Sequence, residues 1–354
     1  MEIRAALPVT DETFEIVTLE LRAPGTDELS VKITACGICH TDMMMMTGGS
    51  RMVFGHEASG IVETVGQGAD DFSVGDHVVL SYPSCGVCGA CRDMRPYDCV
   101  HFSALFSGER LSGTQPLTYQ GKKVRPFFGQ GGFATHTVVH KSSAVKVDRD
   151  CDLRLLGPLG CGVQTGAGSV MNFLKPQQGS SIAILGTGSV GLSAVLAARV
   201  LGCSPIIAVD VVDARLSLAK AFGATHLINA DVSTDIKKVI LDISGGLEYA
   251  FDSTGSVRLM EIAVACMRRG GRGCGVAAAG MPRLSSDARA LKKNWAEIIQ
   301  GCAVPRLFIP QMIGLYRKGV FPFDKMITYF DFKDINAAYQ QAQASKAIKP
   351  VLVM

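Results

Sequence analysis

The chain has 354 residues, of which 19% are charged, and its formal net charge is +3. Because its Lys and Arg residues are scattered, it lacks the basic patch that binds nucleic acid or an anionic membrane. No run approaches the roughly 18 uncharged apolar residues that a membrane-spanning helix needs. We therefore expect a small molecule as the partner, with no nucleic acid and no membrane.

The N-terminal stretch MEIRAALPVTDETFE carries acidic residues early and lacks the continuous apolar core of a signal peptide. This favours a cytoplasmic protein. In a reducing compartment, 12 Cys residues indicate metal ligation or free thiols rather than a disulfide framework. The length favours two domains over one.

The first half of the chain contains short β-type runs broken by glycine. The clearest are SGIVETVG, DHVVLSY and ATHTVVH, at 59–66, 76–82 and 134–140. Such runs predict an antiparallel or barrel-like β domain.

Three residues of metal-ligand type stand apart from one another: Cys39 in ACGICHTD, His56 in FGHEASG and Cys161 in GPLGCGVQTG. Taken singly, a Cys is usually a small buried hydrophobe, and a His beside an acid is often only hydrogen-bonded. Together they form a catalytic zinc set of two thiolates and one imidazole, which keeps the fourth position open. Spacing alone does not join Cys161 to the other two.

Four cysteines gather in CGVCGACRDMRPYDC, with the spacing C-x2-C-x2-C-x7-C: Cys85, Cys88, Cys91 and Cys99. Four thiolates close the tetrahedral shell of Zn²⁺, so such an ion would be structural. The alternatives are a disulfide pair or thiol redox site and, less favoured by this spacing, an iron–sulfur cluster.

From about residue 163 the pattern changes to short buried strands separated by helical segments. The strands are expected at 181–186, 205–210, 249–254 and 272–276, and the helices at 189–202, 214–223 and 256–269. This alternation predicts a parallel sheet with helices on both faces, and so an α/β fold in this half. The tail adds two helical segments, 309–319 and 332–345, and a strand, 350–354.

A dinucleotide-binding signature opens this second half. Gly186, Gly188 and Gly191 follow an apolar strand and begin a helix, an arrangement that lets a pyrophosphate approach the helix N-terminus. Asp210 ends the next strand, where a carboxylate can accept from ribose hydroxyls and repel a 2′-phosphate, which favours NAD over NADP. Arg215 weakens that preference because it could meet a 2′-phosphate. The alternative is that the glycines merely pack a helix on a sheet.

The order of these motifs resembles the zinc-containing medium-chain dehydrogenase/reductase family: GHEASGIVETVG, the four-cysteine lobe, GCG and GTGSVG. The stretches FFGQGGFATHTVV, LLGPLGCGVQTGAGSV and FIPQMIGLYRKGVFPFDKMI are most similar to its benzyl or aryl alcohol dehydrogenases. The resemblance implies a mixed α/β fold. A discontinuous GroES-like catalytic domain is expected over 1–162 and 303–354, with a zinc lobe at about 84–100, and a Rossmann NAD-binding domain over 163–302. A homodimer or homotetramer is also implied.

The resemblance further assigns roles to individual residues. It makes Cys39, His56 and Cys161 the catalytic zinc ligands and the four-cysteine lobe a structural zinc site, so the expected cofactors are two Zn²⁺ per chain and NAD(H). The other roles are those of Thr41 (proton relay from the substrate), Asp42 (orienting the zinc-bound His), Glu57 (an acid near the metal), Thr165 and Val190 (support of the nicotinamide) and Lys349 (a cation for the pyrophosphate).

The chain departs from the family at two places beside the metal. Several relatives have a His three residues after the relay residue, where this chain has Met44, so Thr41 would pass its proton to the cofactor ribose and water or to His40. The link 43–55 is a few residues shorter than usual and lacks its prolines. Its run Met43, Met44, Met45 and Met46 either lines a pocket for an aromatic or terpenoid alcohol or fills the core.

These observations predict a zinc-dependent alcohol dehydrogenase that interconverts a primary, aromatic or bulky apolar alcohol and its aldehyde with NAD. One alternative is a biosynthetic aldehyde or enone reductase acting on a larger metabolite. A remote alternative is a non-catalytic nucleotide-binding or redox-sensing protein.

Overall fold

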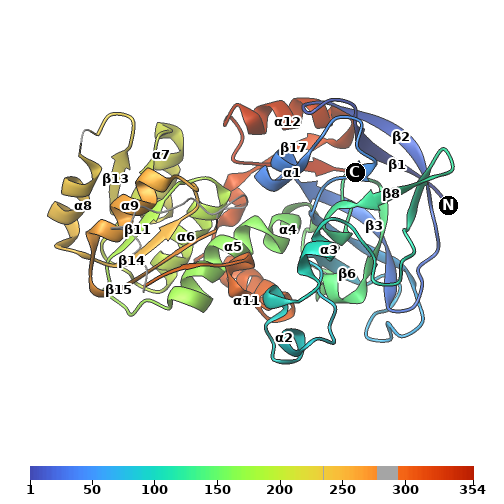
Figure 1. Ribbon diagram of the computed structural model, residues 1–354, viewed down its shortest axis with the longest axis horizontal. Helices are drawn as coiled ribbons and strands as arrows, with labels where there is room; N and C mark the ends of the chain where they lie inside the picture. Colours follow the sequence, from blue (N-terminus) through green and yellow to red (C-terminus); the bar gives the residue numbers. More distant parts are fainter. Residues whose placement is uncertain (234, 277–293) are drawn as a thin grey trace. The chain divides into compact units, whose positions relative to one another are not determined.

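The computed structural model describes residues 1–233, 235–276 and 294–354. The chain forms two compact units. The first comprises Met1–Cys161, Val304–Gln311 and Asp324–Met354, and the second comprises Gly162–Ala303 and Met312–Phe323. Figure 1 colours them along the sequence, with the second unit running from green through yellow to orange.

Two β-sheets build the first unit. The smaller has the order β1 (Glu2–Pro8), β2 (Phe14–Leu21), β7 (Leu117–Tyr119), β8 (Lys122–Pro126) and β4 (Met52–Val53). The larger has the order β10 (Ala144–Val147), β6 (His77–Leu80), β5 (Glu57–Val65), β3 (Glu28–Gly37), β18 (Lys349–Val353) and β17 (Ile327–Asp331), with β9 (His136–His140) also paired to β3. The predicted β character of this half is confirmed.

The end of the chain returns to this larger sheet. β18 pairs antiparallel with β3, which in turn pairs antiparallel with β5. Gly37 on β3 is therefore opposite both Val351 and Glu57. This register brings residues near positions 57 and 349 together.

Helices of the first unit are short, apart from one near the C-terminus. They are α1 (His40–Met45), α2 (Gly89–Arg92), α3 (Phe102–Phe106), α4 (Leu153–Leu156) and α12 (Ile335–Gln343). α12 buries Ile335, Ala338 and Tyr339 in the same apolar core as the sheets. α11 (Pro305–Arg317) has residues in both units.

The second unit contains a six-stranded parallel sheet. Its order is β13 (His226–Asn229), β12 (Ile206–Asp210), β11 (Ile182–Leu185), β14 (Leu247–Asp252), β15 (Met267–Gly275) and β16 (Trp295–Glu297). Numbered within the unit, this is the order 3-2-1-4-5-6 of the Rossmann fold. β11 and β12 are wholly buried, as their apolar sequences require.

Helices connect these strands. They are α6 (Ser189–Val200), α7 (Asp213–Phe222), α8 (Ile236–Ser244) and α9 (Val257–Cys266), while α5 (Gly162–Gly168) precedes the first strand. The mixed α/β class with a GroES-like β unit and a Rossmann unit is thus confirmed. The exact boundaries 1–162, 163–302 and 303–354 stay a prediction, and residues 277–293 of the expected Rossmann domain lie outside the described residues.

Some elements of the second unit differ from the sequence-based expectation. β13 and α8 were not predicted, although Asp235 caps α8 and precedes apolar residues at helical spacing. The helix expected over 256–269 ends at Cys266, and β15 begins at Met267 because those residues pair with β14. Among the described residues, no helix is both long enough and apolar enough to span a membrane.

Candidate functional site

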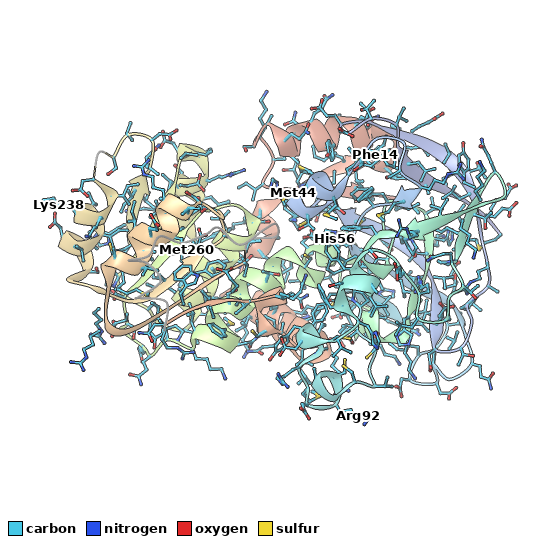
Figure 2. All side chains as sticks on the ribbon, in the orientation of Figure 1. Phe14, Met44, His56, Arg92, Lys238 and Met260 are labelled. Atoms are coloured by element: carbon cyan, nitrogen blue, oxygen red, sulfur yellow. The ribbon has the colours of Figure 1, made fainter. Side chains whose placement is uncertain are left out.

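Cys39, His56 and Cys161, which are far apart in the sequence, meet in the first unit. Their potential ligand atoms all lie within 4.8 Å of one another. Cys39 is the residue before α1, and His56 directly precedes β5. His56, which is labelled in Figure 2, is fully buried. We call these three residues the metal trio.

Cys161 reaches the other two residues because the segment before it packs tightly on the sheet. A Cβ added to Gly157 would lie 2.1 Å from the carbonyl oxygen of Glu57, and one on Gly160 would lie 1.9 Å from that of Leu80. The Ser81 hydroxyl donates to the Gly160 carbonyl at 2.8 Å. Glycine is therefore required at both positions for the backbone to come this close.

The carboxylate of Asp42 holds two members of the trio. It accepts hydrogen bonds from the backbone N–H groups of Cys39 and Gly55, each at 3.0 Å, and its Oδ1 lies 2.9 Å from Nδ1 of His56. Asp42 is fully buried. This matches the arrangement in which a carboxylate orients a metal-bound imidazole through its second nitrogen.

The chemistry of the trio fits a zinc ion. The buried Nε2 of His56 has no hydrogen-bond partner among the described residues. The hydrogen bond between the two thiols lowers the pKa of Cys39 and raises the pKa of Cys161. A divalent ion would satisfy the imidazole and stabilise both thiolates.

An aromatic turn also contacts His56, and no sequence pattern predicted this contact. In the FFG turn (Phe127–Gly129) the ring of Phe128 stacks on the imidazole, with centroids 4.7 Å apart and an angle of 28°. The ring of Phe127 meets it edge-on at 5.5 Å. The only signal in the sequence was the family-like stretch FFGQGGFATHTVV, which does not say what the rings contact.

Glu57, beside His56, pairs with Lys349. Each carboxylate oxygen of Glu57 lies 2.8 Å from Nζ of Lys349, and that ammonium also donates to the carbonyl of Ile38 at 3.2 Å. Burial raises the pKa of Glu57 to about 7, although Lys349 opposes the shift. A Cβ on Gly37 would lie 2.3 Å from Glu57 Oε2, so this glycine makes room for the carboxylate. The role of Lys349 at a pyrophosphate stays a prediction, and the structure gives its ammonium a different partner.

α1 carries the remaining predicted catalytic residues. The hydroxyl of Thr41 lies 3.8 Å from Sγ of Cys39, and His40 is exposed. The methionine run divides: Met44 and Met45 are exposed by 40% and 46%, whereas Met46 is buried in the core and Met43 packs against it.

The four-cysteine lobe forms a second cluster of ligand atoms, again within 4.8 Å of one another. Sγ of Cys91 lies 3.5 Å from that of Cys88 and 3.9 Å from that of Cys85. These separations are close to the edge of about 3.8 Å in a tetrahedron with Zn–S bonds of about 2.3 Å. All four cysteines are free thiols. The lobe is thus a candidate structural zinc site.

The glycine turn of the second unit has the geometry that a dinucleotide requires. Gly186 has φ +84°, and a Cβ on Gly191 would lie 1.7 Å from the Gly186 carbonyl, so both positions need glycine. A Cβ on Gly188 would meet nothing within 4 Å, which leaves open space where α6 begins. This fits a pyrophosphate at the helix N-terminus.

Other predicted cofactor residues lie in the same unit. Asp210 Oδ2 accepts from the N–H and hydroxyl of Thr187, and its Oδ1 accepts from the N–H groups of Val211 and Val212. Arg215 on α7 is partly buried.

Thr165 and Val190 lie on helices that pack together, because a Cβ on Gly166 would be 1.9 Å from the Val190 carbonyl. The Thr165 hydroxyl lies 3.5 Å from Oε1 of Gln300.

Comparison with known proteins agrees with this geometry. A family model described as the alcohol dehydrogenase GroES-like domain matches residues 25–149, and one described as zinc-binding dehydrogenase matches residues 189–306. A geraniol dehydrogenase from Castellaniella defragrans is 40% identical over 346 residues, which cover 95% of this chain and 93% of that protein. An S-(hydroxymethyl)glutathione dehydrogenase from Synechocystis sp. is 34% identical over 367 residues, covering 99% and 100%.

Among solved structures, the benzyl alcohol dehydrogenase from Acinetobacter calcoaceticus matches with a TM-score of 0.93 at 38% identity, covering 100% of this chain and 99% of that one. The chain therefore belongs to the zinc-containing medium-chain dehydrogenase/reductase family. Within that family it is an oxidoreductase of the zinc-type alcohol dehydrogenases, as the motif order predicted.

Proposed function

We propose that this protein is an NAD-dependent dehydrogenase of primary alcohols, with a preference for aromatic or other bulky apolar alcohols. The single observation that supports this most is the metal trio: two buried thiols and a buried imidazole whose ligand atoms lie within 4.8 Å of one another. A set of two Cys and one His leaves one zinc position open for water or substrate.

A zinc ion held by the trio would supply Lewis acidity, which lowers the pKa of bound water to about 7 and acidifies an alcohol in the same way, and NAD would supply the hydride acceptor. The chain's own residues do the rest. Asp42 fixes the tautomer and direction of His56 through Nδ1. The Thr41 hydroxyl relays the proton of the alcohol: it accepts that proton as it releases its own toward the cofactor ribose and water or toward His40, because Met44 cannot carry a proton.

The remaining site assignments belong to the same proposal. The four-cysteine lobe holds a second, structural zinc. The glycine turn and Asp210 bind NAD, and Arg215 lies near its adenosine. Thr165 and Val190 support the nicotinamide. Glu57 acts near the metal together with Lys349. The protein works in the cytoplasm as a homodimer or homotetramer.

The preference for apolar alcohols rests on α1. Met44 and Met45 are exposed, and they follow Thr41 by three and four residues, so they share its helical face. Methionine adapts to aromatic and terpenoid shapes. Relatives named geraniol dehydrogenase and benzyl alcohol dehydrogenase agree with this choice.

A second candidate is an aldehyde or enone reductase that acts on a larger metabolite. The short link 43–55 beside the metal is the feature that favours it. Metal-quantified protein should be assayed with benzyl alcohol, geraniol, S-(hydroxymethyl)glutathione and the corresponding aldehydes and enones, using both NAD(H) and NADP(H). We expect NAD reduction with the two apolar alcohols. Turnover of enones alone would favour the reductase, and zinc-loaded protein inactive on the whole panel would rule out both.

A further inference from the structure

The imidazole of His56 is constrained from two directions. Nδ1 of the ring is hydrogen-bonded to Oδ1 of Asp42, at a distance of 2.9 Å. Against its face lies Phe128, at a centroid distance of 4.7 Å and an angle of 28°. A hydrogen bond at Nδ1 fixes where that atom points but leaves the ring some freedom to tilt out of its plane. A flat surface against the ring removes that freedom.

The backbone conformation of Phe128 is costly. It has φ +58° and ψ +24°, in the left-handed region that a bulky residue rarely adopts. Such a conformation is unfavourable for a bulky residue and persists only where the surroundings enforce it. Here Gly129 and Gly131 continue the turn at φ +65° and +62°, and the buried side chain of Gln130 donates to the Ser81 carbonyl at 2.9 Å.

The residues that follow the turn are hydrogen-bonded to the residues just before His56. Backbone N–H groups of Gly132 and Phe133 donate to the carbonyls of Gly55 and Phe54, at 2.7 and 2.8 Å. Phe106 also packs edge-on against the ring of Phe128, with centroids 5.0 Å apart. Any movement of the turn would therefore be transmitted to the imidazole.

We infer that Phe128 is a positioning residue for the metal ligand His56: its ring fixes the imidazole plane, so that Nε2 points to the place where Cys39 and Cys161 converge. This rests on the proposed zinc site. Filling the core does not require a strained phenylalanine, whereas a flat surface parallel to the imidazole requires an aromatic side chain at this point of the turn.

The test uses full-length protein with cobalt(II) in place of zinc. Phe128→Leu removes the stack, and Phe14→Leu is the control, because Phe14 is also a buried ring of the first unit but contacts Phe133 and Tyr339 instead of His56. Figure 2 shows Phe14 and His56 as separate labelled positions. The readouts are the visible spectrum of the Cys₂His cobalt site, the rate of metal release to a chelator, and the melting temperature. The four-cysteine lobe serves as an internal reference.

We expect Phe128→Leu to alter the cobalt spectrum and to speed metal release from the trio about 10-fold. This is the lower end of the roughly 10–100-fold loss of metal affinity that follows when a group supporting a metal ligand is removed. Phe14→Leu should lower the melting temperature and leave both metal readouts unchanged. Phe128→Tyr keeps the ring but buries a hydroxyl, so it should lose stability and still hold metal like the wild type.

Equal metal release by Phe128→Leu and Phe14→Leu, or by Phe128→Leu and Phe128→Tyr, would overturn the inference. Wild-type protein that takes up metal only at the four-cysteine lobe would instead overturn the proposed function. The two failures are therefore distinguishable.

Discussion

Asp42 is the residue whose contacts connect most of the metal trio, since it binds the backbone N–H of Cys39, that of Gly55 and the ring of His56. Asp42→Asn replaces one acceptor oxygen by a donor, so at least one of these three bonds is lost. We predict a 10–100-fold loss of zinc affinity at the trio, measured by chelator competition. The control Asp242→Asn, which loses only an exposed ion pair with Lys238, should bind zinc normally. Unchanged affinity in Asp42→Asn would contradict this role.

The pair of Glu57 and Lys349 is buried, with side-chain exposures of 0% and 2%. Lys349→Met would leave a carboxylate buried without its cation, and we expect the free energy of unfolding to fall by about 3–5 kcal/mol. The double variant Glu57→Gln, Lys349→Met should recover most of this loss. Urea denaturation measures both. A loss below about 1 kcal/mol in the single variant would mean that the pair is weakly coupled.

At the scale of an element, the segment before Cys161 depends on Gly160, whose added Cβ would lie 1.9 Å from a β6 carbonyl oxygen. Gly160→Ala must push this segment away from the sheet, and Cys161 moves with it. We predict loss of metal from the trio with retention in the four-cysteine lobe, measured by metal analysis after dialysis. Gly314→Ala, where the new methyl group meets nothing within 4 Å, is the matched control. Full metal content in Gly160→Ala would refute the packing argument.

The glycine turn at the start of α6 offers a second pair of variants. Gly188→Ala adds a methyl group in open space, whereas in Gly191→Ala the methyl group would be 1.7 Å from the Gly186 carbonyl. We expect Gly188→Ala to fold with wild-type stability and to bind NAD at least 10-fold more weakly, because the methyl group occupies the pyrophosphate position. Gly191→Ala should lose both stability and NAD binding. Calorimetry with NAD and thermal melting check the pair, and tight NAD binding by Gly188→Ala would place the pyrophosphate elsewhere.

For the whole molecule, the sequence predicted what is encoded locally. The Rossmann strands at 181–186 and 205–210, the glycine turn and the four-cysteine lobe are each specified by neighbouring residues, and the structure contains all of them. These features need only short-range patterns, in which buried strands, glycines and closely spaced thiols have recognisable signatures.

Short-range sequence patterns could not predict the contacts between segments that are far apart in the chain. Cys161 joins His56 because glycines allow a close backbone approach, and Lys349 joins Glu57 because β18 pairs with β3. The stack of Phe128 on His56 depends on a turn whose left-handed φ no composition reveals. Only the family resemblance predicted that Cys161 joins Cys39 and His56. It predicted no partner for Phe128.

The central claim is that the trio carries the chemistry while the second unit binds the cofactor. Cys161→Ser separates these two functions. Oxidation of benzyl alcohol by NAD and binding of NAD should be measured on the same metal-quantified samples of wild type and variant. We predict that the variant loses nearly all turnover and binds NAD like the wild type, because removing a metal ligand removes the Lewis acid. Turnover that survives in Cys161→Ser, at a rate near that of the wild type, would contradict the account.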